Sequence, residues 1–150
     1  MATKIISREI LLTIYKTSAI AILVLIAYFM IIKLIGWSEI VELRFFNVLV
    51  MLFAIKHIVK KEIYIDKGGE DLLTVLMYGV FTSIVISAGF SAFIFFNLSY
   101  ADVTLMQHIK ETQLFGAYLN PLSASLVTFL EGVVSGVVVS FIWFQRMNKA

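Results

Sequence analysis

The chain has 150 residues, of which 61% are hydrophobic and only 15% charged, and its mean hydropathy is +0.97. This composition argues against a water-soluble globular domain, in which about a quarter of the residues are charged, and predicts a membrane protein. The absence of cysteine excludes disulfides, thiolate catalysis and cysteine-ligated zinc, and two histidines are too few for a dense metal site, so no metal or cofactor is expected. The net charge is +2, but the basic residues interrupt apolar runs instead of forming a stripe that would bind nucleic acid.

Four apolar stretches are long enough to cross a bilayer as helices, which requires about 20 residues each. They cover residues 10–35, 40–58, 72–97 and 122–144. The second stretch is the weakest, because its uncharged centre, residues 45–55, is short and both Arg44 and Lys56 must extend toward an interface. The predicted fold is an all-α, integral membrane four-helix bundle that forms a single domain over residues 1–150.

The basic residues predict how the spans are oriented, since lysine and arginine favour the cytoplasmic side of a membrane. Nine of them fall on one side: Lys4, Arg8, Lys16, Lys56, Lys60, Lys61, Lys67, Arg146 and Lys149. Three fall on the other: Lys33, Arg44 and Lys110. Both termini are therefore predicted to be cytoplasmic. The first apolar run is too long for a secretory signal and no cleavage site follows it, so the first span is expected to remain in the mature protein.

The two longer connections carry most of the polar residues. On the outer side, residues 102–120 predict a short interfacial helix between the third and fourth long helices, with Asp102 as a start cap and Gly116 at its end. Asn120 and Pro121 then cap and open the fourth span. On the inner side, residues 57–71 are expected to connect the second and third spans.

Three lysines at that inner connection, Lys56, Lys60 and Lys61, are candidates for contact with anionic lipid headgroups, at about 1 kcal/mol for each residue near the surface. A topology signal on a solvated helix end is the favoured interpretation of the same residues.

Small residues recur every four positions along the third and fourth spans. In the third span they are Gly79, Ser83, Ser87 and Ser91; in the fourth they are Ala124, Thr128, Gly132, Gly136 and Ser140. In lipid, helices associate where small side chains let their backbones approach closely. The two stripes predict a hairpin of the third and fourth helices, although the same stripes are equally suited to self-association.

Glu131 is the one acid deep inside a predicted span, about 12 Å from the span's outer start at 1.5 Å per residue. A charge at that depth costs roughly 2.5 kcal/mol or more, so Glu131 should be paired, protonated or in contact with water. Arg44 is the expected partner, Asn47 lies on nearly the same face and can add a hydrogen bond, and Lys33 is a second candidate partner. A structural Glu131–Arg44 clamp is favoured, while proton or cation binding by Glu131 and simple water exposure stay open.

Certain residues of the second and fourth spans are characteristic: residues 43–47 (LRFFN), 129–132 (FLEG), 135–136 (SG) and 141–142 (FI) before a basic tail. They resemble a domain-of-unknown-function family of small bacterial inner-membrane proteins with four helices, and the likeness covers most of the chain. Because that family has no established activity, the resemblance implies a four-helix fold in the bacterial cytoplasmic membrane and nothing about catalysis. The residues that carry the resemblance include Arg44, Asn47 and Glu131, the same three polar positions that the burial argument selects.

No hydrolase elbow, P-loop, HExxH motif or pair of catalytic carboxylates is present, so an enzyme is not expected. The favoured hypothesis is a structural or accessory membrane protein, with the bilayer and a homo-oligomer or larger membrane complex as partners. One alternative is an oligomeric proton- or cation-coupled transporter or channel that uses Glu131. Small multidrug transporters also have one membrane glutamate, but it lies in their first helix. The first predicted span of this chain has no acid in its core. The other alternative is a regulatory subunit that binds lipid or a partner through the inner lysines.

Overall fold

The computed structural model describes residues 8–36, 45–66, 72–101, 103–112 and 116–147, and all regular structure in these ranges is helical. The five α-helices are α1 (Arg8–Ile35), α2 (Phe45–Asp66), α3 (Leu72–Phe96), α4 (Val103–Thr112) and α5 (Pro121–Met147). A π-helical turn, Asn97–Ala101, extends α3, and a short 3-10 turn, Gly116–Tyr118, precedes α5. The prediction of an all-α fold is therefore confirmed.

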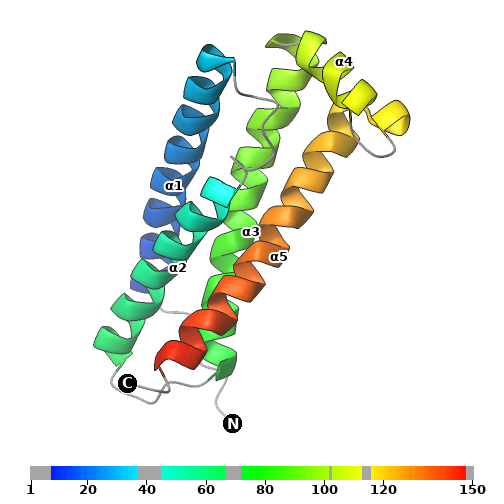
Figure 1. Ribbon diagram of the computed structural model, residues 1–150. Helices are drawn as coiled ribbons and strands as arrows, with labels where there is room; N and C mark the ends of the chain where they lie inside the picture. The colour runs from blue at the N-terminus through cyan, green and yellow to red at the C-terminus, as the bar shows by residue number, and fades with distance from the viewer. Residues whose placement is uncertain (1–7, 37–44, 67–71, 102, 113–115, 148–150) are drawn as a thin grey trace.

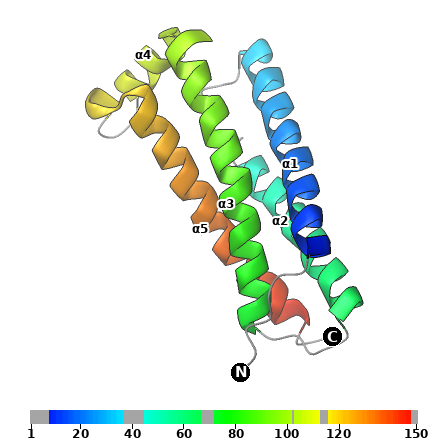
Figure 2. The same cartoon turned by 180° about the vertical axis from the view of Figure 1, so that it is seen from behind.

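The four long helices lie side by side, and α4 lies at the end of α3 and α5, on the side away from α1 (Figures 1 and 2). Helix α3 packs against α1, α2 and α5, and its most extensive interface is with α5. Helix α2 also contacts both α1 and α5. The first turn of α1 and the last turn of α5 are at the same end, opposite α4 (Figure 1). This end is called the termini end below.

Three helical segments are long and apolar enough to span a membrane: Arg8–Ile35, Leu72–Ala101 and Pro121–Arg146. They correspond to the first, third and fourth predicted spans, and helix α2 is not among them. The described part of α2 begins well below the upper ends of α1 and α3 in Figure 1, so it covers only part of their length. The weakest predicted span is thus also the least apolar of the four long helices.

Helix α2 differs from its prediction at the inner end. The span was expected over residues 40–58, whereas the helix continues to Asp66 and takes up much of the predicted inner connection; residues 40–44 lie outside the described part of the chain. No glycine or proline interrupts the sequence before Gly68. Up to Val59 the helix buries side chains at a three-to-four spacing: Ile55, Ile58 and Val59 are each at most 2% exposed. The next two residues, Lys60 and Lys61, are exposed.

Specific residues account for where α1 ends and where α5 begins. Helix α1 stops at Gly36, which has a φ of 80° and donates its N–H to the Lys33 carbonyl at 3.1 Å. Helix α5 starts with the predicted cap: Asn120 Oδ1 accepts the Ser123 N–H, and Ser123 Oγ accepts the Asn120 N–H, each at 2.8 Å. Pro121 occupies the first helical position. Asp102, the predicted cap of α4, lies outside the described residues.

Candidate functional site

The small-residue stripes of α3 and α5 face each other within one chain. At three levels a glycine of one helix lies against a serine of the other, so close that a Cβ on the glycine would overlap the serine side chain. The pairs are Gly79 with Ser140, Ser83 with Gly136, and Ser87 with Gly132. Each four-residue step up α3 matches a four-residue step down α5, as an antiparallel pair requires. We call these six residues, with Ser91 and Thr128, the α3–α5 seam.

The hydroxyl groups of the seam are largely satisfied by backbone carbonyls. Thr128 Oγ1 and Ser140 Oγ donate to the carbonyl four residues earlier in their own helix, at 3.1 and 2.6 Å. Ser91 Oγ crosses the interface and donates to the Ser125 carbonyl at 2.8 Å. Ser87 Oγ is buried and has no hydrogen-bond partner among the described residues. The seam is a packing surface on which the other hydroxyls bond to the backbone, and in this structure it joins helices of the same chain.

The predicted intramembrane cluster is only partly placed. Arg44 lies outside the described residues, Asn47 is half-buried in the first turn of α2, and Lys33 is half-buried in the last turn of α1. Glu131 is exposed on α5 and makes no hydrogen bond or ion pair with any residue that the structure describes. The Glu131–Arg44 clamp stays a prediction.

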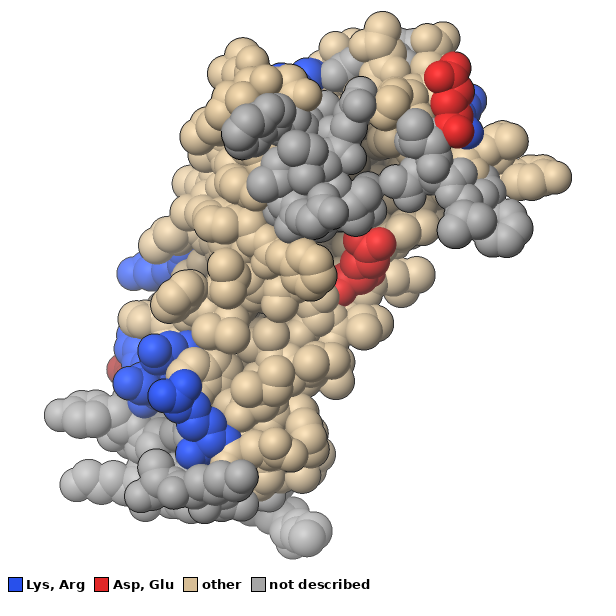
Figure 3. Space-filling model, viewed as in Figure 1, with Lys and Arg blue, Asp and Glu red and all other residues tan. Residues whose placement is uncertain are grey.

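The inner lysines do not form one cluster, because Lys56 and Lys61 are five residues apart and therefore about 140° apart around a helix. Lys56 Nζ lies 5.2 Å from the centre of the Trp143 ring, and Arg146 Cζ lies 5.6 Å from the same ring. Lys61 turns toward α1, and Lys60 is exposed. Basic side chains nevertheless gather toward the termini end of the molecule on the face shown in Figure 3.

Trp143 joins this basic group to the core. Its indole Nε1 donates to the Leu52 carbonyl at 3.3 Å, and the side chain is only 8% exposed. The ring thus connects the last turns of α5 to α2 and presents its face to two cations, an arrangement that suits the interface between hydrocarbon and water.

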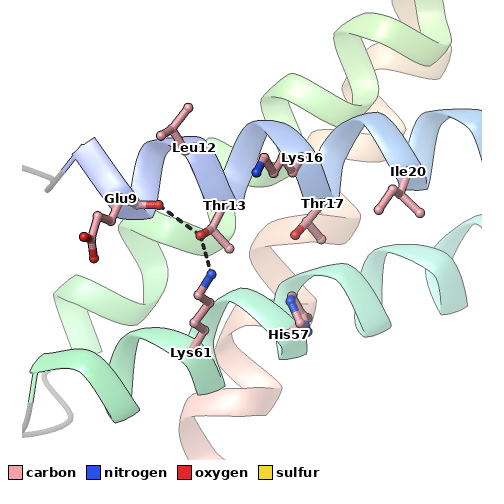
Figure 4. A pocket seen from close by; sticks show the side chains of 8 residues that line it. All are labelled: Glu9, Leu12, Thr13, Lys16, Thr17, Ile20, His57 and Lys61. Carbon is pink, nitrogen blue, oxygen red and sulfur yellow. Dashed lines mark hydrogen bonds between the residues drawn. The ribbon is translucent and has the colours of Figure 1, made fainter.

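A pocket of about 390 Å³ opens between the first turns of α1 and the second half of α2 (Figure 4). It is lined by Glu9, Leu12, Thr13, Lys16, Thr17, Ile20, His57 and Lys61. Lys61 Nζ donates to Thr13 Oγ1 at 2.8 Å, and Thr13 Oγ1 donates to the Glu9 carbonyl at 2.9 Å. The buried threonine therefore fixes the position of the Lys61 ammonium at the pocket wall. We call this site the α1–α2 pocket.

Sequence analysis did not identify this pocket, although its pattern is present in the sequence. Glu9, Thr13 and Thr17 recur every four residues in the first turns of α1, which places them on one helix face, and His57 and Lys61 have the same spacing on α2. Lys16 was interpreted only as a topology signal. The pairing of the two faces depends on the packing of α1 against α2, which neither pattern specifies.

The described residues contain no group of three or more His, Asp or Glu side chains that could hold a metal ion. No family model, curated protein or solved structure matches the chain. The resemblance to small bacterial four-helix membrane proteins accordingly stays a prediction.

Proposed function

We propose that this chain is a multi-pass protein of the bacterial cytoplasmic membrane with a structural or accessory role, and that it is not an enzyme. The observation that supports membrane placement best is the apolar exterior of the three long segments. In their most hydrophobic windows only 17%, 39% and 22% of the residues are buried inside the protein. Most of these apolar side chains therefore need lipid, or another membrane segment, as their surroundings.

The proposed architecture is a four-helix membrane bundle in which α2 is the fourth span and the termini end is cytoplasmic. The support is the excess of lysine and arginine at that end, together with the contacts of Lys56 and Arg146 with Trp143. If α2 did not cross the membrane, Lys61 and the start of α3 would both lie on the outer side, whereas the distribution of basic residues predicts that both are on the inner side. The resemblance to bacterial four-helix proteins agrees with this topology.

Topology is tested by single-cysteine labelling, for which the cysteine-free wild type is the background. Leu34→Cys, Lys60→Cys and Tyr118→Cys place a thiol at exposed positions near the ends of helices. With a membrane-impermeant maleimide, positions 34 and 118 should react in intact cells, and position 60 only after permeabilisation. Equal reaction of positions 34 and 60 in intact cells would show that α2 does not cross.

Glu131 supports the accessory role, because it is exposed on α5 among apolar side chains that are themselves exposed. Val127, Leu130 and Val134 are 46%, 59% and 62% exposed. A carboxylate at that depth in a membrane costs roughly 2.5 kcal/mol or more, and either Arg44 of the same chain or a partner segment in a homo-oligomer or larger complex would relieve that cost.

The exposed Glu131 also favours a second candidate function, proton- or cation-coupled transport by an oligomer. The two functions differ in flux through purified protein in liposomes that contain a pH-sensitive dye. The accessory role predicts the same proton leak for wild type, Glu131→Gln and empty liposomes. A leak or exchange that requires Glu131 would replace the accessory role with transport.

A further inference from the structure

We propose that the α1–α2 pocket binds the phosphate group of an anionic phospholipid whose acyl chains lie along α1. The site goes beyond the structural or accessory role proposed above, and it rests on the membrane placement of α1. The pocket has a volume of about 390 Å³ and is more open than enclosed.

Donors for a phosphate line the pocket on two helices. Lys16 and Thr17 come from α1, and His57 and Lys61 come from α2 (Figure 4). An ammonium group has three donors, and Lys61 uses one of them on Thr13, so two remain for a ligand. The bond to Thr13 also reduces the side-chain freedom that Lys61 would lose when a phosphate binds.

The pocket is polarised along its length. Among the described residues that line it, the one acid is Glu9, which is exposed in the first turn of α1; in Figure 4 its carboxylate lies at one end of the pocket, away from His57. The lining has two lysines, Lys16 and Lys61, so its positive charge is larger than the negative charge of Glu9. In Figure 4 the Lys61 ammonium lies beside Thr13, between Glu9 and His57. The central part of the pocket is therefore the part that suits an anion.

The depth of the pocket suits a headgroup. Lys16 and Lys33 are 17 residues apart, about 26 Å along the helix axis, which is slightly less than the roughly 30 Å thickness of the hydrocarbon core. If Lys33 lies at one boundary of the core, Lys16 lies at the opposite boundary, and Thr13, one turn earlier, lies in the headgroup region.

An apolar surface continues from the pocket into the membrane. Leu12 and Ile20 are lining residues that are 51% and 64% exposed. One turn beyond Ile20, Leu23 and Val24 are exposed on α1, at 66% and 42%. A ligand with a phosphate at one end and hydrocarbon at the other fits this sequence of surfaces better than a free phosphate does, since a soluble anion gains nothing from the apolar wall.

The test is lipid retention by the full-length protein in mild detergent, measured by native mass spectrometry with added phosphatidylglycerol or phosphatidylcholine. The wild type should retain phosphatidylglycerol preferentially. Lys16→Gln and Lys61→Gln should each weaken that binding about fivefold, and the double variant about 25-fold. Lys60→Gln is the matched control, because Lys60 is the exposed neighbour of Lys61 and does not line the pocket. It should retain wild-type binding, as should Lys61→Arg.

Three outcomes would overturn the proposal. Equal losses in Lys60→Gln and Lys61→Gln would mean that the overall charge, and not the pocket, attracts the lipid. Unchanged retention in the double variant would remove the site altogether. Displacement of the lipid by millimolar inorganic phosphate would identify a site for soluble anions. Because Lys16 and Lys61 are exposed, the variants should keep the wild-type helix content by circular dichroism. The cysteine labelling described above separately tests the membrane placement on which the site depends.

Discussion

Replacing Gly79 by alanine tests the α3–α5 seam most directly. A Cβ at position 79 would lie 2.6 Å from Ser140 Cβ, and Ser140 is fully buried. Carbon atoms pack at about 3.5–4.0 Å, so the two helices would have to separate locally by about 1 Å. Rotation of the serine side chain does not help, since Cβ stays in place in every rotamer.

The magnitude follows from two opposing terms. Overpacking of a well-packed interface costs typically 1–3 kcal/mol, and the rigid Cβ contact places Gly79→Ala toward the upper end. Alanine offsets about 1 kcal/mol of this through its higher helix propensity. We expect a net destabilisation of about 2 kcal/mol, measured as the free energy of unfolding when sodium dodecyl sulfate is titrated into mixed micelles and helix content is followed by circular dichroism.

Gly89→Ala is the matched control. Position 89 is also inside α3, but there the new Cβ meets the flexible end of the Ile22 side chain, which can rotate away. This variant should lose no stability. Ser140→Gly combined with Gly79→Ala should recover stability, with a coupling of about 1 kcal/mol or more. Equal effects of the two alanine substitutions, or no recovery in the double variant, would refute the close contact between these helices.

Two further substitutions test single contacts. Asn120→Ala removes the side chain that caps α5 and should cost about 1 kcal/mol of stability in the same unfolding assay, whereas Asn120→Asp should keep most of it; no difference between the two would mean that the cap contributes nothing. Trp143→Phe keeps the aromatic ring near Lys56 but removes the indole donor to the Leu52 carbonyl, and should cost about 0.5–1.5 kcal/mol; a larger loss would show that ring size, and not the hydrogen bond, dominates at this position.

Local patterns were sufficient to predict the helices. The length of the apolar runs predicted α1, α3 and α5, and the Asn120–Pro121 pair marked the start of α5 within one residue. The end of α2 was predicted too early, because the charged residues after Ile58 were taken as the end of a span. A helix ends where its backbone can no longer continue, and charged residues do not by themselves end it.

The sites depended on neighbours distant in the sequence. Lys56 and Lys61 are close in the sequence, but they lie on different faces of α2. Lys56 contacts the Trp143 ring, and Lys61 donates to Thr13. No local pattern contains that information, because it depends on which helix lies on each side of α2.

The sequence by itself determined that this is a helical protein with long apolar segments and small-residue stripes, since these follow from hydropathy and a four-residue period. Only the tertiary structure decided that Gly79 meets Ser140 in the same chain and that Thr13 meets Lys61 across α1 and α2. The physical reason is that a periodic pattern defines which side chains share a helix face. The partner of that face is chosen by the combined packing of all the helices.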